Sequence, residues 1–83
     1  MVWSVYILEC ADGSLYTGIA KDVEARLAKH NSGKGARYTC GRLPVFLKYS
    51  ETVETHGEAL KREYQIKQVS RQGKLALIAT NPL

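Results

Sequence analysis

Hydrophobic residues fall along the chain in short runs that predict alternating strands and helices. Residues 2–10 are rich in β-branched, aromatic and aliphatic side chains, which is typical of a strand. Asp12-Gly13 then indicates a tight turn, because glycine accepts positive φ without steric penalty. Residues 15–19 form the partner strand of a hairpin, and a third strand follows over residues 45–50.

A helix is expected directly after the hairpin. Asp22 is a good N-cap for a helix that ends near Asn31. Arg26 and His30 lie four residues apart beside its apolar stripe, so their side chains project together. Residues 32–35 form a glycine-containing break that lacks the spacing of a P-loop.

The second half of the chain predicts two further helices. The longer one begins at Thr55 or His56 and continues to about Val69, and a short one covers residues 74–79. The order β-β-α-β-α-α indicates an α/β chain of the α+β type, with an at least partly antiparallel sheet covered by helices. The length of 83 residues is enough for a single domain, residues 1–83.

Glu63 lies on the wrong side of the longer helix for a charged residue. It falls in the middle of the apolar arc that Leu60, Tyr64 and Ile66 define. An unpaired carboxylate there would cost several kcal/mol, so it needs a cation, a metal or a cleft. Two interpretations remain open: a structural ion pair, for which Arg26 is the suggested partner, and a metal-binding or acid–base carboxylate.

Composition excludes several classes of protein. A hydrophobic fraction of 45% and a charged fraction of 24% are those of a globular domain, with Trp3 and Phe46 expected in its core. No apolar run approaches the ~20 residues of a membrane span, and no signal peptide is apparent, so we expect a cytoplasmic protein. Cys10 and Cys40 form neither a disulfide framework nor, with two histidines, a zinc site.

The positive charge is concentrated in two blocks. The formal net charge is +4. Residues 21–48 contribute seven basic and two acidic side chains, and residues 61–74 contribute five and one, whereas residues 49–60 carry three glutamates. Two basic blocks suggest a surface for a polyanion such as nucleic acid. The alternative is a solvated surface with a chance excess of charge.

The motifs together resemble those of the GIY-YIG nucleases. The paired tripeptides of that family resemble Val5-Tyr6-Ile7 and Tyr16-Thr17-Gly18. The resemblance continues through the segments Lys21–Leu27, His30-Asn31 and Ala59–Lys67, and the segment Gly33–Thr39 is similar to the small stand-alone bacterial, YhbQ-like members. It implies a small three-stranded antiparallel sheet flanked by helices.

The resemblance also implies an activity, namely metal-dependent endonuclease cleavage of DNA with little sequence specificity, in DNA repair or processing. Tyr6 and Tyr16 match the two active-site tyrosines, Arg26 the arginine that neutralises the scissile phosphate, and His30 a histidine that assists proton transfer. Glu63 matches the carboxylate that binds a divalent metal, Mg²⁺ or Mn²⁺. We expect Arg26 and the metal to favour the tyrosine phenolate, whose pKa is otherwise near 10.

Nucleic acid, DNA rather than RNA, is the expected partner, and a protein partner that supplies targeting is a further possibility. The candidate binding residues surround the first helix and the loop after it, with Tyr38 able to stack on an exposed base: Lys21, Lys29, Lys34, Arg37, Tyr38 and Arg42.

Two other functions stay open. One is a nucleic-acid-binding module with the same fold and weak or no activity, because Ile19 stands where some members have lysine and residues 68–80 lack the asparagine of others. The other is a protein-interaction domain, or an enzyme with a different phosphate-containing substrate.

The length of the hairpin loop tests the catalytic interpretation. A two-residue turn at Asp12-Gly13 would place Tyr6 and Tyr16 on opposite faces of the sheet, because side chains alternate along a strand. A three-residue loop, residues 11–13, places both tyrosines on one face. A site that uses both tyrosines therefore predicts an odd-length loop or a bulge.

Overall fold

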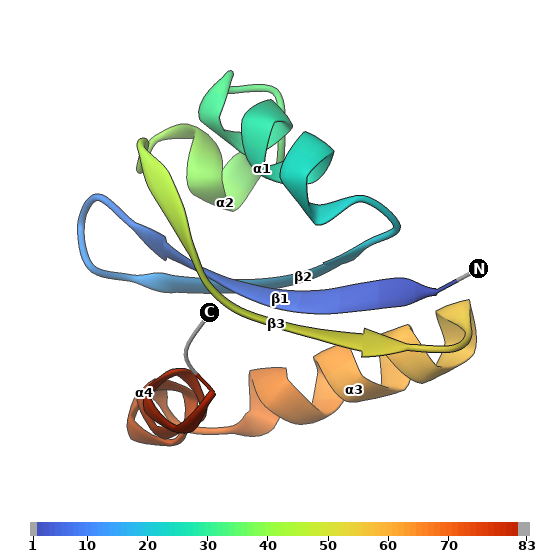
Figure 1. Cartoon of the computed structure of the whole chain (residues 1–83). Helices are drawn as coiled ribbons and strands as arrows, with labels where there is room; N and C mark the ends of the chain where they lie inside the picture. Colours follow the sequence, from blue (N-terminus) through green and yellow to red (C-terminus); the bar gives the residue numbers. More distant parts are fainter. Residues whose placement is uncertain (1, 82–83) are drawn as a thin grey trace.

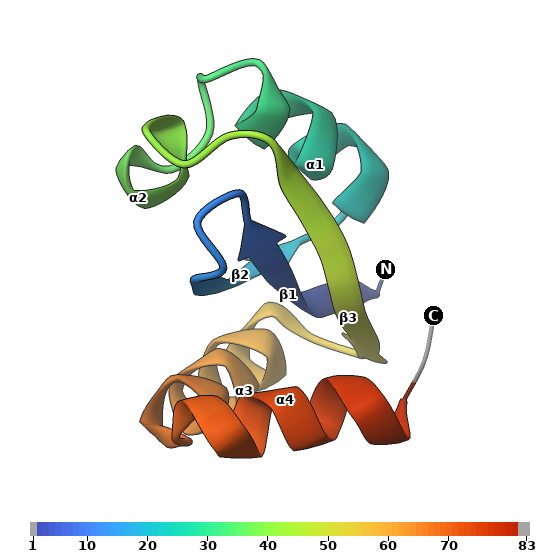
Figure 2. The same cartoon turned by 90° about the vertical axis from the view of Figure 1, so that its left-hand side faces the viewer.

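A three-stranded antiparallel sheet lies between two layers of helices in the computed structural model, which describes residues 2–81 (Figure 1). The strands are β1 (Trp3–Cys10), β2 (Leu15–Ala20) and β3 (Val45–Val53), in the order β2-β1-β3. Helices α1 (Val23–Asn31) and α2 (Arg37–Cys40) cover one face, and α3 (His56–Gln68) and α4 (Arg71–Thr80) cover the other (Figures 1 and 2). Across this part of the chain, none of the helices is long and apolar enough to cross a membrane.

The predicted order of elements is confirmed, with one addition. The Asp22 side chain caps α1 by accepting from the amide of Ala25 at 3.0 Å, and Thr55 caps α3 in the same way. The single turn α2 was not predicted, because four residues are too few to show a helical period. Strand β3 extends three residues beyond the predicted end.

The hairpin between β1 and β2 has the three-residue loop that a two-tyrosine site requires. Gly13, the last residue of the loop, has a φ of +85°, the conformation that closes such loops. Leu8 pairs with Tyr16 across the strands, so Tyr6, two residues before Leu8, is on the same face as Tyr16. That face is the one covered by α1.

The two faces of the sheet form separate cores. On the α1 side, partly buried residues of α1 pack against a buried cluster of Tyr6, Leu8, Cys10, Ala20 and Val45. On the other side, residues of α3 and α4 pack against the sheet around Val5, Ile7, Tyr49, Ala59 and Ile66.

A bulge in β3 corrects the expected position of Phe46. Ile7 pairs with Tyr49 but Leu8 pairs with Leu47, so Lys48 is an extra residue and the side-chain alternation changes there. As a result Leu47 packs on the α1 side although Tyr49 packs on the α3 side. Phe46 consequently points away from the α1 core and is 54% exposed, whereas Trp3 packs against the α3 core as predicted.

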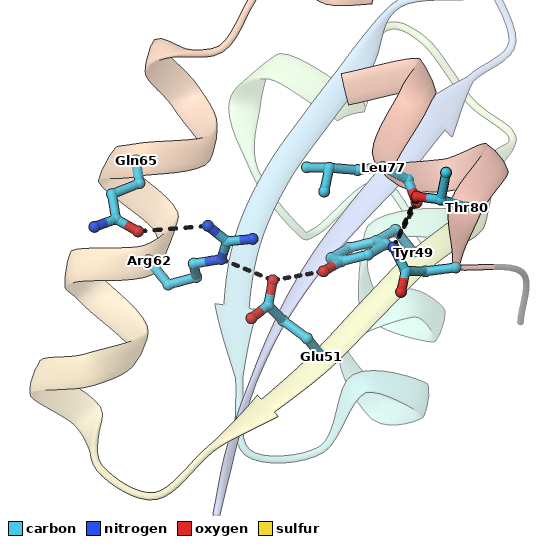
Figure 3. Close-up of polar contacts among 7 residues, drawn as sticks. Tyr49, Glu51, Arg62, Gln65, Leu77 and Thr80 are labelled. Carbon is cyan, nitrogen blue, oxygen red and sulfur yellow. Dashed lines mark hydrogen bonds and ion pairs between the residues drawn. The ribbon is translucent and has the colours of Figure 1, made fainter. Parts of the chain in front are cut away.

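A polar cluster fixes α3 to the edge strand β3 (Figure 3). Arg62 donates from Nε to Glu51 at 2.9 Å, and the same carboxylate oxygen accepts from the Tyr49 hydroxyl at 2.6 Å. Burial and the bond to Glu51 hold the pKa of Tyr49 above its usual value, so its hydroxyl remains a donor. Because Arg62 precedes Glu63, this cluster also sets where the candidate metal ligand lies.

Asn31 joins the end of α1 to the start of β3. Its side-chain amide accepts from the amide of Val45 at 2.8 Å and donates to the carbonyl of Val45 at 3.1 Å. Val45 is 1% exposed, so without Asn31 its backbone groups would be left in a poorly hydrated position.

We expect Asn31→Ala to lower the free energy of unfolding by roughly 2 kcal/mol, because it removes two hydrogen bonds and leaves buried backbone groups unpaired. For a chain of this size that loss corresponds to about 8–16 °C in the thermal midpoint. Asn81→Ala at the exposed end of α4 is the matched control and should change stability by no more than about 0.5 kcal/mol. Equal losses in the two variants would contradict this role of Asn31.

Candidate active site at the edge of the sheet

A buried hydrogen bond joins β1 to α1 at the centre of the candidate site. The hydroxyl of Tyr6 lies 3.0 Å from Nε2 of His30. Tyr6 is 2% exposed and His30 is 0% exposed, so water cannot replace either partner. Without this bond the Tyr6 hydroxyl and Nε2 of His30 would be buried and unpaired. The structure therefore brings together two of the predicted catalytic residues.

The other ring nitrogen of His30 is held by α2. Nδ1 lies 2.9 Å from the hydroxyl of Thr39, which itself donates to the carbonyl of Ala36 at 3.0 Å. Thr39 and Tyr6 therefore hold the imidazole ring by its two nitrogen atoms. The amide of Ala36 donates to Nδ1 at the longer distance of 3.4 Å.

Thr39 is a site residue that sequence reasoning missed. It is fully buried, and its hydroxyl holds the orientation of the His30 ring. The Gly33–Thr39 segment contributed to the family resemblance, but a threonine in a single helical turn has no pattern that predicts this contact.

Two glycines make the close approach of these side chains possible. A Cβ on Gly18 would lie 2.6 Å from the Tyr6 hydroxyl oxygen and 3.1 Å from Cε2 of Tyr16. A Cβ on Gly35 would lie 2.5 Å from Nδ1 of His30. Gly18 stands opposite Tyr6 in the hairpin register, so the missing side chain leaves room for the phenol over the edge strand β2.

Tyr16 lies beside the Tyr6–His30 pair. Its ring centroid is 5.3 Å from that of His30, in an edge-on arrangement, and 6.5 Å from that of Tyr6. Tyr38 stacks on it from α2, at 5.9 Å and 28°. The guanidinium of Arg42 lies over the Tyr38 ring, 4.1 Å from its centroid.

The pKa of Tyr6 lies above its usual value, which corrects the expectation of a favoured phenolate. Burial is the largest cause, and it disfavours the charged form. Arg26 lowers the pKa through a hydrogen bond and its charge, but not enough to offset burial. Tyr6 is accordingly a neutral phenol at neutral pH.

The two charges that change the pKa of Tyr6 come from helices on opposite sides of the sheet, Arg26 from α1 and Glu63 from α3. Helices α1 and α3 cover opposite faces of the sheet (Figure 2). Both Arg26 of α1 and Glu63 of α3 nevertheless act on the Tyr6 hydroxyl, the first lowering and the second raising its pKa. Helices α1 and α3 both also pack against the edge strand β2, so the candidate site lies along that strand.

Glu63 does not form the ion pair that was suggested for it. Within residues 2–81 its partner is Lys67, one turn later on α3, at 3.4 Å, and not Arg26. The Glu63 side chain is 21% exposed and that of Lys67 is 50% exposed. A single ion pair with so exposed a partner is weak, so the carboxylate remains accessible to a competing cation.

A pocket of about 330 Å³ opens beside Arg26, between the end of β2 and α1. Lys21, Arg26 and Lys29 supply positive charge to it, and Ile19 is part of its apolar wall. Of the other predicted binding residues, Lys34 and Arg37 are exposed. Tyr38 and Arg42 instead have partners inside the protein, Tyr16 for the first and Asp12 for the second.

The fold and this geometry define a class of small α+β domain in which the two strands of a hairpin each carry a tyrosine on the face that α1 covers. The chain belongs to the GIY-YIG family of nucleases: the family model of the GIY-YIG catalytic domain matches residues 2–76.

The similar proteins support that membership. A UPF0213 protein of Staphylococcus aureus (strain Mu3) is 65% identical over 74 residues, which cover 89% of this chain and 90% of the relative. The solution NMR structure of a UPF0213 protein from Bacillus halodurans is 48% identical with a TM-score of 0.62, and that of a protein from E. faecalis is 40% identical with a TM-score of 0.65. Each alignment covers 96% of this chain and 85% of the chain in the solved structure.

We expect Gly18→Ala to destabilise the protein by about 1–3 kcal/mol, because the added methyl group overlaps the Tyr6 hydroxyl. Thermal unfolding measures the loss. Gly41→Ala is the matched control: a Cβ there meets nothing within 4 Å, and the φ of Gly41 is −93°. It should stay within about 0.5 kcal/mol of the parent. A Gly18→Ala protein as stable as this control would contradict the close approach of the Tyr6 hydroxyl to Gly18.

The buried imidazole predicts a pH dependence of stability. Burial, and next the charge of Arg26, hold the pKa of His30 below its ordinary value of 6.5. Between the two values the unfolded chain binds more protons than the folded one, so stability falls as pH decreases below about 6.5. We expect the free energy of unfolding in urea to fall from about pH 7.5 to about pH 5.5, and His30→Gln to reduce this slope.

His56→Gln is the control for that measurement, since it retains the buried histidine. Its slope should match that of the parent protein. A His30→Gln protein with the same slope as the parent would show that His30 is not the group that takes up the proton.

Proposed function

We propose that the protein is a cytoplasmic metal-dependent endonuclease that hydrolyses phosphodiester bonds of DNA with little sequence specificity. The observation that carries the proposal is the convergence of Tyr6, Tyr16, Arg26 and His30, with the charge of Glu63, at the edge strand β2. These residues come from two strands and two helices, and two of them, Tyr6 and His30, are almost fully buried. Membership of a nuclease family supports the same conclusion.

The Tyr6–His30–Thr39 chain is suited to moving a proton. Hydrolysis forms a bond between a water oxygen and phosphorus, breaks a phosphorus–oxygen ester bond, and releases the water proton. Tyr6 is neutral and bonded to Nε2 of His30. In the tautomer with its proton on Nδ1, the imidazole can take the Tyr6 proton as the Tyr6 oxygen accepts, through Tyr16, the proton that the water loses. The lowered pKa of His30 makes the imidazolium short-lived, so the proton passes back out through Tyr6 and ends on the leaving oxygen.

Tyr16 completes the reacting edge of the site. Its ring is half-buried between His30 and Tyr38, so its hydroxyl is open to a substrate in a way that the buried Tyr6 hydroxyl is not. We assign Tyr16 to orient the attacking water and Tyr6 to relay the proton inward.

Arg26 is the residue placed to neutralise the phosphate. Its guanidinium is half-buried, acts on the Tyr6 hydroxyl and lines the neighbouring pocket. A planar guanidinium stabilises the charge that develops on the non-bridging oxygens in the transition state. Lys21 and Lys29 on the rim of the pocket, with Lys34 and Arg37 beyond it, would bind the flanking backbone.

The donor chemistry fits a hard divalent cation at Glu63. Mg²⁺ and Mn²⁺ bind through one or two carboxylates, and their other ligands are waters and substrate phosphate oxygens. Among the described residues no group of three His, Cys, Asp or Glu side chains could hold a metal, so most of the ligands beside Glu63 would be waters and substrate oxygens. The Thr17 hydroxyl lies on the face of β2 that α3 covers, and it is buried without a partner among the described residues. One neutral oxygen on the α3 side of β2 is therefore unused. When bound, the ion would polarise the phosphate.

Glu63→Ala tests the proposal. Removal of the only candidate carboxylate should reduce Mg²⁺- or Mn²⁺-dependent cleavage by about 100-fold or more, as expected for the loss of several kcal/mol of transition-state stabilisation. The assay uses single-stranded, duplex and branched DNA, and Glu54→Ala, in the turn before α3, is the matched control with unchanged activity. A Glu63→Ala protein that cleaves as fast as the parent contradicts the assignment. Parent protein that binds DNA but cleaves none of these substrates would be a binding module.

A further inference from the structure

Three residues connect the hairpin loop to the ring of Tyr16. Arg42 donates from Nε to Asp12 at 3.1 Å and from Nη1 to the carbonyl of Tyr38 at 2.7 Å. Its guanidinium lies over the Tyr38 ring, and Tyr38 stacks on Tyr16. We call Asp12, Arg42 and Tyr38 the brace.

The loop end of the brace is itself firmly held. Asp12 accepts from the amide and the hydroxyl of Ser14, at 3.0 and 2.6 Å. These bonds, and to a lesser extent the charge of Arg42, keep the pKa of Asp12 below its usual value, so its carboxylate is charged at neutral pH. The carbonyl of Arg42 also accepts from the amide of Ala11 at 2.9 Å. The β1–β2 loop and the segment after α2 are thus tied by both backbone and side chain.

Tyr16 needs such support because of its place in the sheet. It belongs to the edge strand β2, and its ring is only partly covered. His30 meets it edge-on, which leaves Tyr38 as the residue that stacks along its ring. A small rotation of Tyr16 would move its hydroxyl away from the reacting water, and small misplacements of reacting groups are costly in rate.

We propose that Tyr38 and Arg42 are positioning residues that hold the Tyr16 ring against His30, and not ligands of the nucleic acid. From the sequence, both residues were expected to bind nucleic acid. In the structure, however, the positive charge of Arg42 is paired with Asp12, and the Tyr38 ring lies between Arg42 and Tyr16 in a stack. The catalytic part of this proposal rests on the proposed function, since it assumes that Tyr16 acts in cleavage.

The test compares Arg42→Ala, Tyr38→Leu and Tyr38→Phe. Loss of the brace should reduce kcat by about 10- to 100-fold in the first two variants, with the Kd for DNA within about twofold of the parent. Tyr38→Phe keeps the stacking ring and should recover most of the kcat that Tyr38→Leu loses. Tyr38→Leu breaks no ion pair, so it tests the stack even where Arg42→Ala unfolds the loop.

Two further readouts separate positioning from binding. The ring signals of Tyr16 in ¹³C NMR, assigned with Tyr16→Phe, should shift in Tyr38→Leu and return toward the parent values in Tyr38→Phe. The slope of log Kd against log salt should be unchanged in Arg42→Ala, whereas loss of one phosphate contact lowers it by about 0.9 on duplex DNA. Lys34→Ala, an expected phosphate contact, should lower that slope without moving the Tyr16 signals.

A weaker Kd and a lower salt slope in Arg42→Ala, with Tyr16 signals and kcat unchanged, would overturn the proposal and make Arg42 a phosphate ligand. The NMR readout does not depend on activity. If the parent protein cleaves no DNA, the proposed function fails, and the Tyr16 signals still decide whether the brace positions that ring.

Discussion

The hydrogen bond between Tyr6 and His30 is the interaction on which the rest of the site depends. A phenol and an imidazole that are both almost fully buried must satisfy each other, since neither has access to water. The bond forms only where Gly18 leaves room for the phenol and Gly35 for the imidazole. It also requires the tyrosine to face α1. The buried pair therefore constrains the surrounding structure as much as the apolar cores do.

The phenol of Tyr6 extends from the central strand β1 over Gly18 of the edge strand β2, and this place explains how a very small protein assembles a site from both of its helical layers. Beside the edge strand β2, Arg26 from one layer and Glu63 from the other both influence the Tyr6 hydroxyl. Burial outweighs the arginine, so the protein keeps a neutral phenol in contact with a neutral imidazole, an arrangement suited to passing protons rather than storing charge.

Much of the fold was predictable because its signals are local. Side chains such as Asp22 and Thr55 cap helices through contacts within four residues, so their sequence positions mark the helix starts. The three-residue length of the hairpin loop followed from the requirement that Tyr6 and Tyr16 share one face, although the Asp12-Gly13 pair by itself suggested a two-residue turn. The bulge at Lys48 was not predictable, because the same apolar residues suit either face of the sheet until the helices are placed. The contact of Thr39 with His30 and the raised pKa of Tyr6 depend on burial, which no spacing of residues reveals.

The central claim is that one site at the β2 edge joins the tyrosines to a metal-binding Glu63. Paramagnetic broadening of backbone NMR signals by Mn²⁺ tests it most directly. The account predicts broadening centred on Tyr16–Ile19 and on the turn of α3 around Glu63, and its loss in Glu63→Gln. Broadening centred instead on the acidic residues 51–58, or broadening that survives in Glu63→Gln, would contradict it.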